Sequence, residues 1–166
     1  MVTRIVSMLA GAAGAIAVSQ APGFTGAYMQ NLEGRIDELR TIVERFEANI
    51  AMIGYDRDRA LEECSVAEQL LGALCDGITQ DIARYDTLLA HQAELLAAAP
   101  WARPVILARN PQMDIAESAY ARFEPAVPAT ATGAGYATAG FAGGWGVLTV
   151  LLGILTAPFR RRRDAY

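Results

Sequence analysis

The sequence predicts an all-α membrane protein, in which two terminal transmembrane helices flank an antiparallel, coiled-coil-like helical hairpin. Three observations lead to this fold class. Charged residues are absent from residues 5–24 and again from residues 125–159. The hydrophobic fraction of 53% is high for a small soluble domain, and the excess lies in these two windows. Between them, apolar residues recur at spacings of three and four, as in amphipathic helices.

The first window, residues 1–24, is expected to be a retained N-terminal transmembrane anchor. Its uninterrupted apolar run from Ile5 to Val18 is only as long as the core of a cleavable signal peptide, which is the alternative. Against cleavage, small residues recur at four-residue spacing at Ser7, Gly11 and Ala15, as in a helix that packs closely on a neighbour. Gly11 and Ala15 are therefore expected to be helix-packing positions.

The last segment, residues 129–166, is expected to be a Gly-rich transmembrane helix followed by a cytoplasmic Arg tail. A bilayer core requires about 20 apolar residues, and this window is longer. Gly140 and Gly144 form a GxxxG pair, so this face could pack on the first anchor, a second copy or a foreign subunit. The following cluster of positive charge predicts orientation: Arg160, Arg161, Arg162 and Arg163.

Charge asymmetry predicts that the middle of the chain is periplasmic and that both termini are cytoplasmic. Each anchor has Arg on its outer flank, and the positive-inside rule places such flanks in the cytoplasm. Residues 25–128 contain nine Arg and 17 Asp and Glu, a net charge of −8. All 14 positive residues are Arg, which is typical of a GC-rich bacterial genome, so we expect a bacterial inner-membrane protein.

The acidic middle, residues 25–128, is predicted to contain three helices. The first carries a heptad seam, formed by Tyr28, Leu32, Ile36, Leu39, Val43, Phe46, Ile50 and Ile53. Gly54 predicts its end, and a second helix is expected over residues 61–96, with Leu89 and Leu96 on its seam. Since the turn between them is short, they should form an antiparallel hairpin. A third helix is expected from Asn110 to Phe123.

The two cysteines, Cys64 and Cys75, fall within the second predicted helix. A separation of eleven residues corresponds to about 16 Å along a helix at ~1.5 Å per residue, too far for a disulfide within that helix. We expect small buried hydrophobic residues. A bridge between two copies of the chain is the alternative.

No catalytic, cofactor-binding or metal-binding residue is expected. His91 is the only histidine, which argues against a His/Cys metal cluster and a His-dependent catalytic set. The sequence has no Walker-type phosphate loop, and the terminal Arg cluster is explained by orientation, so nucleic-acid binding is not expected. We therefore expect a protein that is not an enzyme, with no cofactor and no small-molecule substrate.

The expected function is that of an accessory or structural subunit that packs in the inner membrane through its small-residue helix faces. Its partners would be membrane lipid and a membrane-protein complex or a second copy of the chain. The alternative is a periplasmic helical binding module with membrane anchors, for which Tyr85, Trp101 and Tyr120 are candidate contact residues. A pore of several copies would need a polar stripe, for which only Thr138, Thr149 and Thr156 are candidates.

Two stretches carry a resemblance to a known family. One follows the first anchor and contains Gln20, Pro22, Phe24, Tyr28, Gln30, Leu32, Gly34, Asp37 and Glu38. The other precedes the second anchor and contains Phe123, Pro125, Ala126, Val127 and Pro128. With these residues the chain resembles an uncharacterised proteobacterial membrane family, domain of unknown function 2937, over essentially its whole length. The resemblance implies the two-anchor topology and no particular activity.

Overall fold

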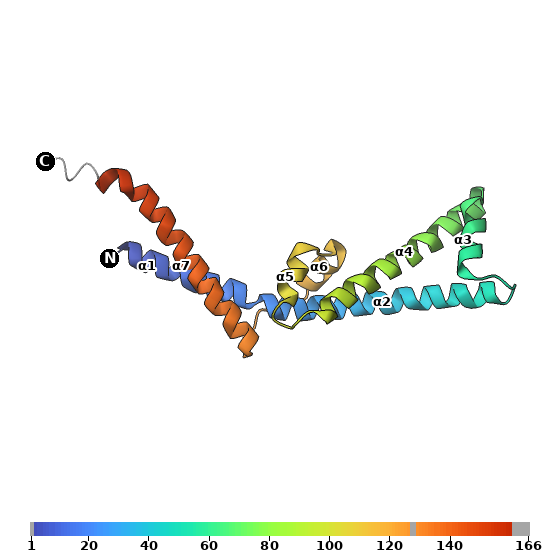
Figure 1. Ribbon diagram of the computed structural model, residues 1–166, viewed down its shortest axis with the longest axis horizontal. Coiled ribbons are helices and arrows are strands. Elements are labelled where there is room, and N and C mark those ends of the chain that lie inside the picture. The colour runs from blue at the N-terminus through green and yellow to red at the C-terminus, as the bar shows by residue number, and fades with distance from the viewer. Residues whose placement is uncertain (1, 127–128, 161–166) are drawn as a thin grey trace. The chain divides into compact units, whose positions relative to one another are not determined.

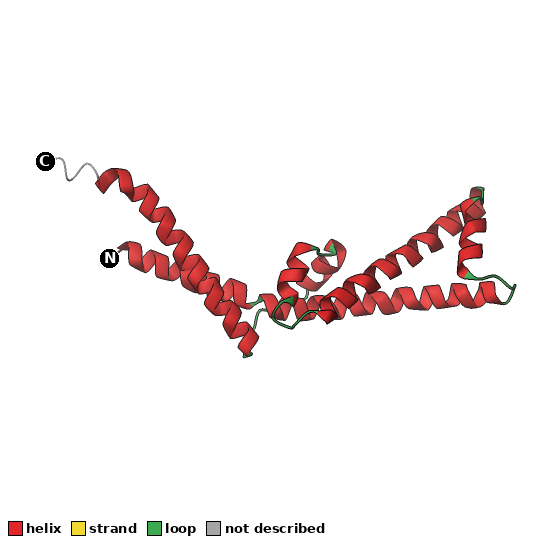
Figure 2. Cartoon of the chain, in the orientation of Figure 1, coloured by secondary structure: helices red, strands yellow, loops and turns green. Residues whose placement is uncertain are grey.

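The computed structural model describes residues 2–126 and 129–160, and helices are the only regular secondary structure in them (Figure 2). This confirms the predicted all-α class. The chain divides into two compact units. Unit 1 contains residues 1–27, 100–110 and 120–166, and unit 2 contains residues 28–99 and 111–119.

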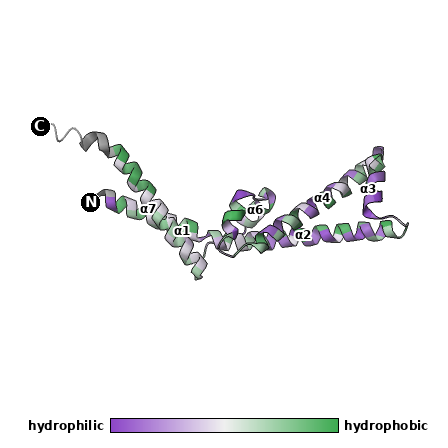
Figure 3. Cartoon of the chain, viewed as in Figure 1, coloured by the Kyte–Doolittle hydropathy of each residue, from purple (hydrophilic) through white to green (hydrophobic). Residues whose placement is uncertain are grey.

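Unit 1 is built on two apolar helices, α1 (Val2–Ser19) and α7 (Ala131–Arg160), with the short α5 (Arg103–Arg109) (Figure 1). After a break at Gln20, α2 (Ala21–Ala51) begins. Within the described residues, two helical stretches are long and apolar enough to cross a membrane, Arg4–Ala51 and Ala131–Leu155. Figure 3 shows the contrast between α1 and α7, which are apolar, and α2 to α4, which alternate hydrophobic and hydrophilic residues.

Unit 2 contains most of α2, together with α3 (Arg57–Ser65), α4 (Gln69–Ala97) and most of α6 (Met113–Tyr120). The predicted seam of the first helix is confirmed over five positions, because the side chains of Tyr28, Leu32, Ile36, Leu39 and Val43 are all buried. The buried seam ends before Ile53, whose side chain is 70% exposed. Gly54 has a φ of +78°, a conformation that costs glycine little, and the chain turns there as predicted.

The second predicted helix is wrong, because the chain breaks it into α3 and α4 at residues 66–68. Gln69 has a φ of +52°, which turns the backbone sharply at the start of α4. A Cβ atom at position 72 would lie 2.8 Å from the Ala67 carbonyl oxygen, so Gly72 allows the turn to pack against α4. The heptad pattern continues through this break and therefore conceals it.

The short-turn coiled-coil hairpin is not confirmed, since α3 lies between α2 and α4 in the chain (Figure 1). Near the far end of α4 the buried side chains also differ from those predicted. Leu88, His91 and Leu95 are buried, whereas Leu89 is half-buried and Leu96 is exposed. His91 is paired there with the Tyr28 hydroxyl of α2, a contact between helices that the pattern of α4 alone does not reveal.

The third predicted helix is shorter than expected and is preceded by another. α6 spans Met113–Tyr120, within the predicted residues 110–123. α5, which the sequence pattern did not predict, precedes it and has Pro104 in its first turn. Proline is favoured at this position because the first helical N–H groups have no partner within the helix. Two seven- to eight-residue helices are too short to show a clear apolar period.

A disulfide joins Cys64 of α3 to Cys75 of α4, with the two Cα atoms 5.2 Å apart. The prediction that these residues could not bond to each other is therefore wrong. It assumed a continuous helix, whereas the break at residues 66–68 turns α3 back against α4 and brings the two side chains together.

Protein extracted from its native host without reductant should therefore contain no cysteine that reacts with iodoacetamide after denaturation. Prior reduction should expose two, which intact-mass spectrometry would count. The double change Cys64→Ser and Cys75→Ser should lower the free energy of unfolding by about 3 kcal/mol, the value expected for closing a loop of this length. Two alkylated cysteines in the unreduced sample would contradict the pairing.

Candidate functional site

The closest packing in unit 1 lies between α1 and α7. Ser7, Gly11, Gly14 and Val18 of α1 are four, three and four residues apart, so they lie on one face of the helix. Gly140 lies against Gly14 and Val18, and Gly144 lies against Ala10 and Gly11. Since the residue numbers rise on one helix as they fall on the other, the two helices are antiparallel. We call this contact the glycine seam.

The glycine seam requires the absence of side chains. A Cβ atom added to Gly144 would lie 2.5 Å from the Ala10 carbonyl oxygen, and one added to Gly11 would lie 2.9 Å from a ring carbon of Phe141. At Gly14 and Gly140 an added Cβ would collide with the backbone carbonyl of the other glycine. The two backbones are therefore in direct contact, which is the geometry that small residues permit between apolar helices.

Three of the four predicted packing residues, Gly11, Gly140 and Gly144, lie in the glycine seam, and Ala15 is half-buried beside it. Gly14 was not predicted. The prediction used a constant spacing of four residues, which leads from Gly11 to Ala15. The seam instead alternates spacings of four and three, as in a heptad, and this leads from Gly11 to Gly14. Of the predicted orientation residues, Arg160 is the last residue of α7, and Arg161, Arg162 and Arg163 lie outside the described residues.

A second contact in unit 1 joins the chain at the break after α1 to the segment before α7. The Gln20 side-chain amide donates to the Ala126 carbonyl at 3.1 Å, and its oxygen accepts the Ala126 N–H at 3.0 Å. The rings of Phe24 and Phe123 meet edge to face with centroids 5.7 Å apart. All four residues belong to the two stretches that carry the family resemblance. Gln20, Phe123 and Ala126 also line a cavity of about 540 Å³.

Unit 2 contains a buried polar pair, Tyr28 and His91. The Tyr28 hydroxyl lies 2.9 Å from His91 Nε2 and accepts the backbone N–H of Gln112 at 3.1 Å. His91 Nδ1 is buried without a hydrogen-bond partner. Burial lowers the pKa of His91 from its usual 6.5, because a buried charged ring loses the hydration that it has in water. Nearby, Arg84 makes an ion pair with Asp114 at 2.8 Å, which fixes α6 on α4.

The three aromatic residues proposed as periplasmic contacts belong to different units. Tyr85 belongs to unit 2, where it is half-buried and its hydroxyl accepts a long hydrogen bond from Arg40. Trp101 and Tyr120 belong to unit 1, and both are largely exposed. Within residues 2–126 and 129–160, no group of three or more His, Cys, Asp or Glu could hold a metal ion.

The threonines of α7 were the candidates for a polar stripe through a pore. Thr138 and Thr149 each donate to the carbonyl four residues earlier in α7, which is the usual pairing of threonine in apolar helices. The side chain of Thr156 lies outside the described part of the structure. The two described hydroxyls are therefore satisfied by their own helix.

These features define a class: an all-helical protein with two apolar helices, each long enough to cross a membrane, and an acidic helical region between them in the chain. The chain belongs to the family described as "Protein of unknown function (DUF2937)", whose sequence model matches residues 2–161. No curated protein and no solved structure gave a match.

Two leucine substitutions on one helix test the glycine seam. Gly140→Leu should lower the free energy of unfolding by about 1–3 kcal/mol, because the new side chain has no room. Gly143→Leu is the matched control, since no atom of another segment lies within 4 Å of a Cβ at that position, and its effect should stay within about 0.5 kcal/mol. Unfolding of each variant in mixed micelles gives both values. Equal effects of the two substitutions would contradict the seam.

Acid should destabilise the protein through His91. Because the pKa of His91 is lower in the folded than in the unfolded state, the unfolded chain binds more protons once the pH falls below about 6.5. Stability is therefore full above this value and decreases as the pH falls toward the folded-state pKa. Thermal unfolding at pH 7.5, 6.5 and 5.5 should show this loss in the wild type and a smaller loss in His91→Gln. An unchanged pH dependence in the variant would contradict the assignment.

Proposed function

We propose that this protein is a non-enzymatic accessory subunit of the bacterial inner membrane, with α1 and α7 as two antiparallel membrane spans. The single observation that carries this proposal is the glycine seam, in which two helices that are apolar on their outer faces are held together by direct backbone contact. Only 17% and 6% of the most apolar windows of the two helices are buried, so neither resembles the core helix of a soluble protein. Such exposed apolar faces suit lipid or other membrane helices.

The topology follows from the antiparallel pairing. The start of α1 and the end of α7 lie at the same end of the pair, so Arg4 and the Arg cluster after α7 would lie on one side of the membrane (Figure 1). The positive-inside rule makes this side the cytoplasm and the acidic middle periplasmic. The disulfide between Cys64 and Cys75 supports the same assignment independently, because disulfides persist in the periplasm and are rare in the cytosol.

The accessory role rests on a second small-residue face of α7. At 100° per residue this face lies opposite the glycine seam, and it consists of Gly135, Ala139, Ala142, Gly146 and Gly153. A Cβ at Gly135 or Gly146 would have no atom of another segment within 4 Å, so the face is open at these positions in the single chain. We call it the open α7 face. Its occupant would be a helix of another membrane subunit or of a second copy.

Aromatic residues at one end of the spans agree with this placement. The Tyr136 hydroxyl donates to the Trp101 backbone carbonyl at 2.8 Å, and both residues line a groove of about 440 Å³ whose lining also includes Gly135. Tyrosine and tryptophan are enriched where a membrane meets water. This groove would therefore lie at the periplasmic surface, next to the open α7 face.

Native purification tests the proposed role. Full-length protein with a C-terminal tag should copurify from its host, in gentle detergent, with a stoichiometric membrane protein or with untagged copies of itself. Gly146→Leu should reduce this association at least tenfold, because the added side chain blocks the open α7 face. Gly143→Leu, which lies beside that face, should retain it.

The same preparation tests the two spans. Mass spectrometry should find a chain that begins at its first residues. A new N-terminus near Gln20 would contradict the first span, and a monomer without a partner, or association that Gly146→Leu leaves unchanged, would contradict the accessory role.

A further inference from the structure

Unit 2 has an apolar groove of about 350 Å³ at the end where α3 meets α4. Its lining comes from three helices: Ile42, Arg45, Phe46 and Asn49 of α2, Cys64 of α3, and Leu71, Leu74, Cys75 and Ile78 of α4. Leu71 and Leu74 are 62% and 65% exposed, so large side chains are left uncovered there. The volume lies within the range of small-molecule sites, which are mostly apolar with a few polar groups.

The charge of this lining is opposite to that of its surroundings. Unit 2 contains 16 Asp and Glu and six Arg, a net charge of −10. No acidic residue lines the groove, and its one charged side chain is Arg45. Three acidic residues directly adjoin lining residues in α2 and α4: Glu44, Glu47 and Asp76. At 100° per residue each lies about 150° around its helix from the mean direction of the groove residues.

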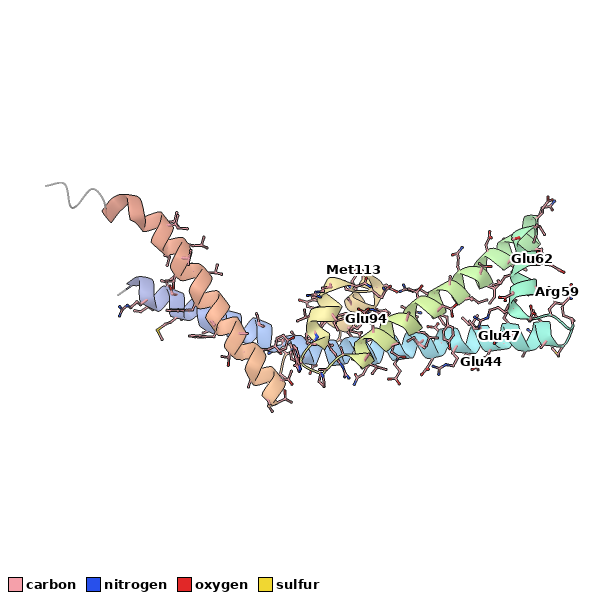
Figure 4. The ribbon with its side chains drawn as sticks, viewed as in Figure 1. Glu44, Glu47, Arg59, Glu62, Glu94 and Met113 are labelled. Atoms are coloured by element: carbon pink, nitrogen blue, oxygen red, sulfur yellow. A yellow bond between two sulfur atoms is a disulfide. The ribbon has the colours of Figure 1, made fainter. Side chains whose placement is uncertain are left out.

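Arg45 is also the only Arg of unit 2 that is not engaged by a neighbour. Four others form ion pairs with carboxylates: Arg35, Arg40, Arg57 and Arg84. The guanidinium of Arg59 lies 4.3 Å from the ring centroid of Tyr55, at the end of unit 2 that also carries Glu62 and Glu47 (Figure 4). Arg45 has neither kind of contact among the residues of this unit, all of which the structure describes.

We propose that this groove binds a fatty acid, with the acyl chain among the apolar side chains of α2 and α4 and the carboxylate on Arg45. The disulfide shapes the groove, since Cys64 and Cys75 form part of its wall and hold α3 in place. The acidic remainder of unit 2 does not prevent this, because charges on the far sides of the helices are screened beyond about 8 Å at physiological ionic strength. The site goes beyond the packing of the spans and does not depend on it.

A photoreactive fatty acid tests the site on the full-length protein. The chain would be placed in nanodiscs of phosphatidylcholine, exposed to myristic acid that carries a diazirine, irradiated and digested for peptide mapping. We expect labelled peptides from residues 42–49 and 71–78, in addition to labelling of the lipid-exposed α7. Excess plain myristate should remove the label from the groove, whereas the same amount of tetradecanol should not, because it lacks the carboxylate.

Matched variants assign the carboxylate to Arg45. Arg45→Gln should lower groove labelling at least fivefold while the labelling of α7, an internal control, stays unchanged. Arg35→Gln, an exposed position on the same helix whose partner is Glu38, should retain groove labelling. Unchanged labelling in Arg45→Gln, or label confined to α1 and α7, would overturn the proposal. So would cross-linking of the groove residues to a second copy or to another polypeptide in place of the lipid.

Discussion

The direct contact between the backbones of α1 and α7 is the constraint on which the arrangement of unit 1 depends. In lipid, where we propose that α1 and α7 lie, two apolar helices gain little hydrophobic free energy by associating and rely on close van der Waals contact. Gly14 and Gly140 make that contact because glycine has no Cβ atom, and a Cβ at either position would collide with the backbone of the other helix. The antiparallel direction follows from this pairing, and it brings the start of α1 and the end of α7 to the same end of the pair.

The break after α1 connects this seam to the rest of the chain. The Gln20 side chain makes hydrogen bonds with the N–H and the carbonyl of Ala126, and Phe24 packs on Phe123. The segment that follows α1 is therefore fixed to the segment that precedes α7. In unit 2 the Tyr28 and His91 pair and the disulfide act at different places. The Tyr28 and His91 pair joins α2 to the end of α4, and the disulfide joins α3 to the beginning of α4. The first contact joins residues 63 apart in the sequence, and the second joins residues 11 apart.

The sequence predicted those features that follow from local periodicity and from long apolar runs. The seam from Tyr28 to Val43, the turn at Gly54 and the two apolar helices are of this kind, as is the small-residue character of Gly140 and Gly144. The break at residues 66–68 could not be read from the pattern, because a heptad continues through it and only the left-handed Gln69 and the fold of α3 onto α4 reveal it. The disulfide was missed for the same reason. Gly14 could have been found from a heptad reading of α1.

The most direct test of the proposed topology is the accessibility of single cysteines to a membrane-impermeant maleimide. In a background with Cys64→Ser and Cys75→Ser, Ser118→Cys would report on an exposed position of α6 and Ala165→Cys on the C-terminus. In intact spheroplasts we expect labelling at position 118 and none at position 165, which should react only after lysis. Labelling at position 165 in intact spheroplasts, or protection of position 118, would contradict two spans with a periplasmic middle.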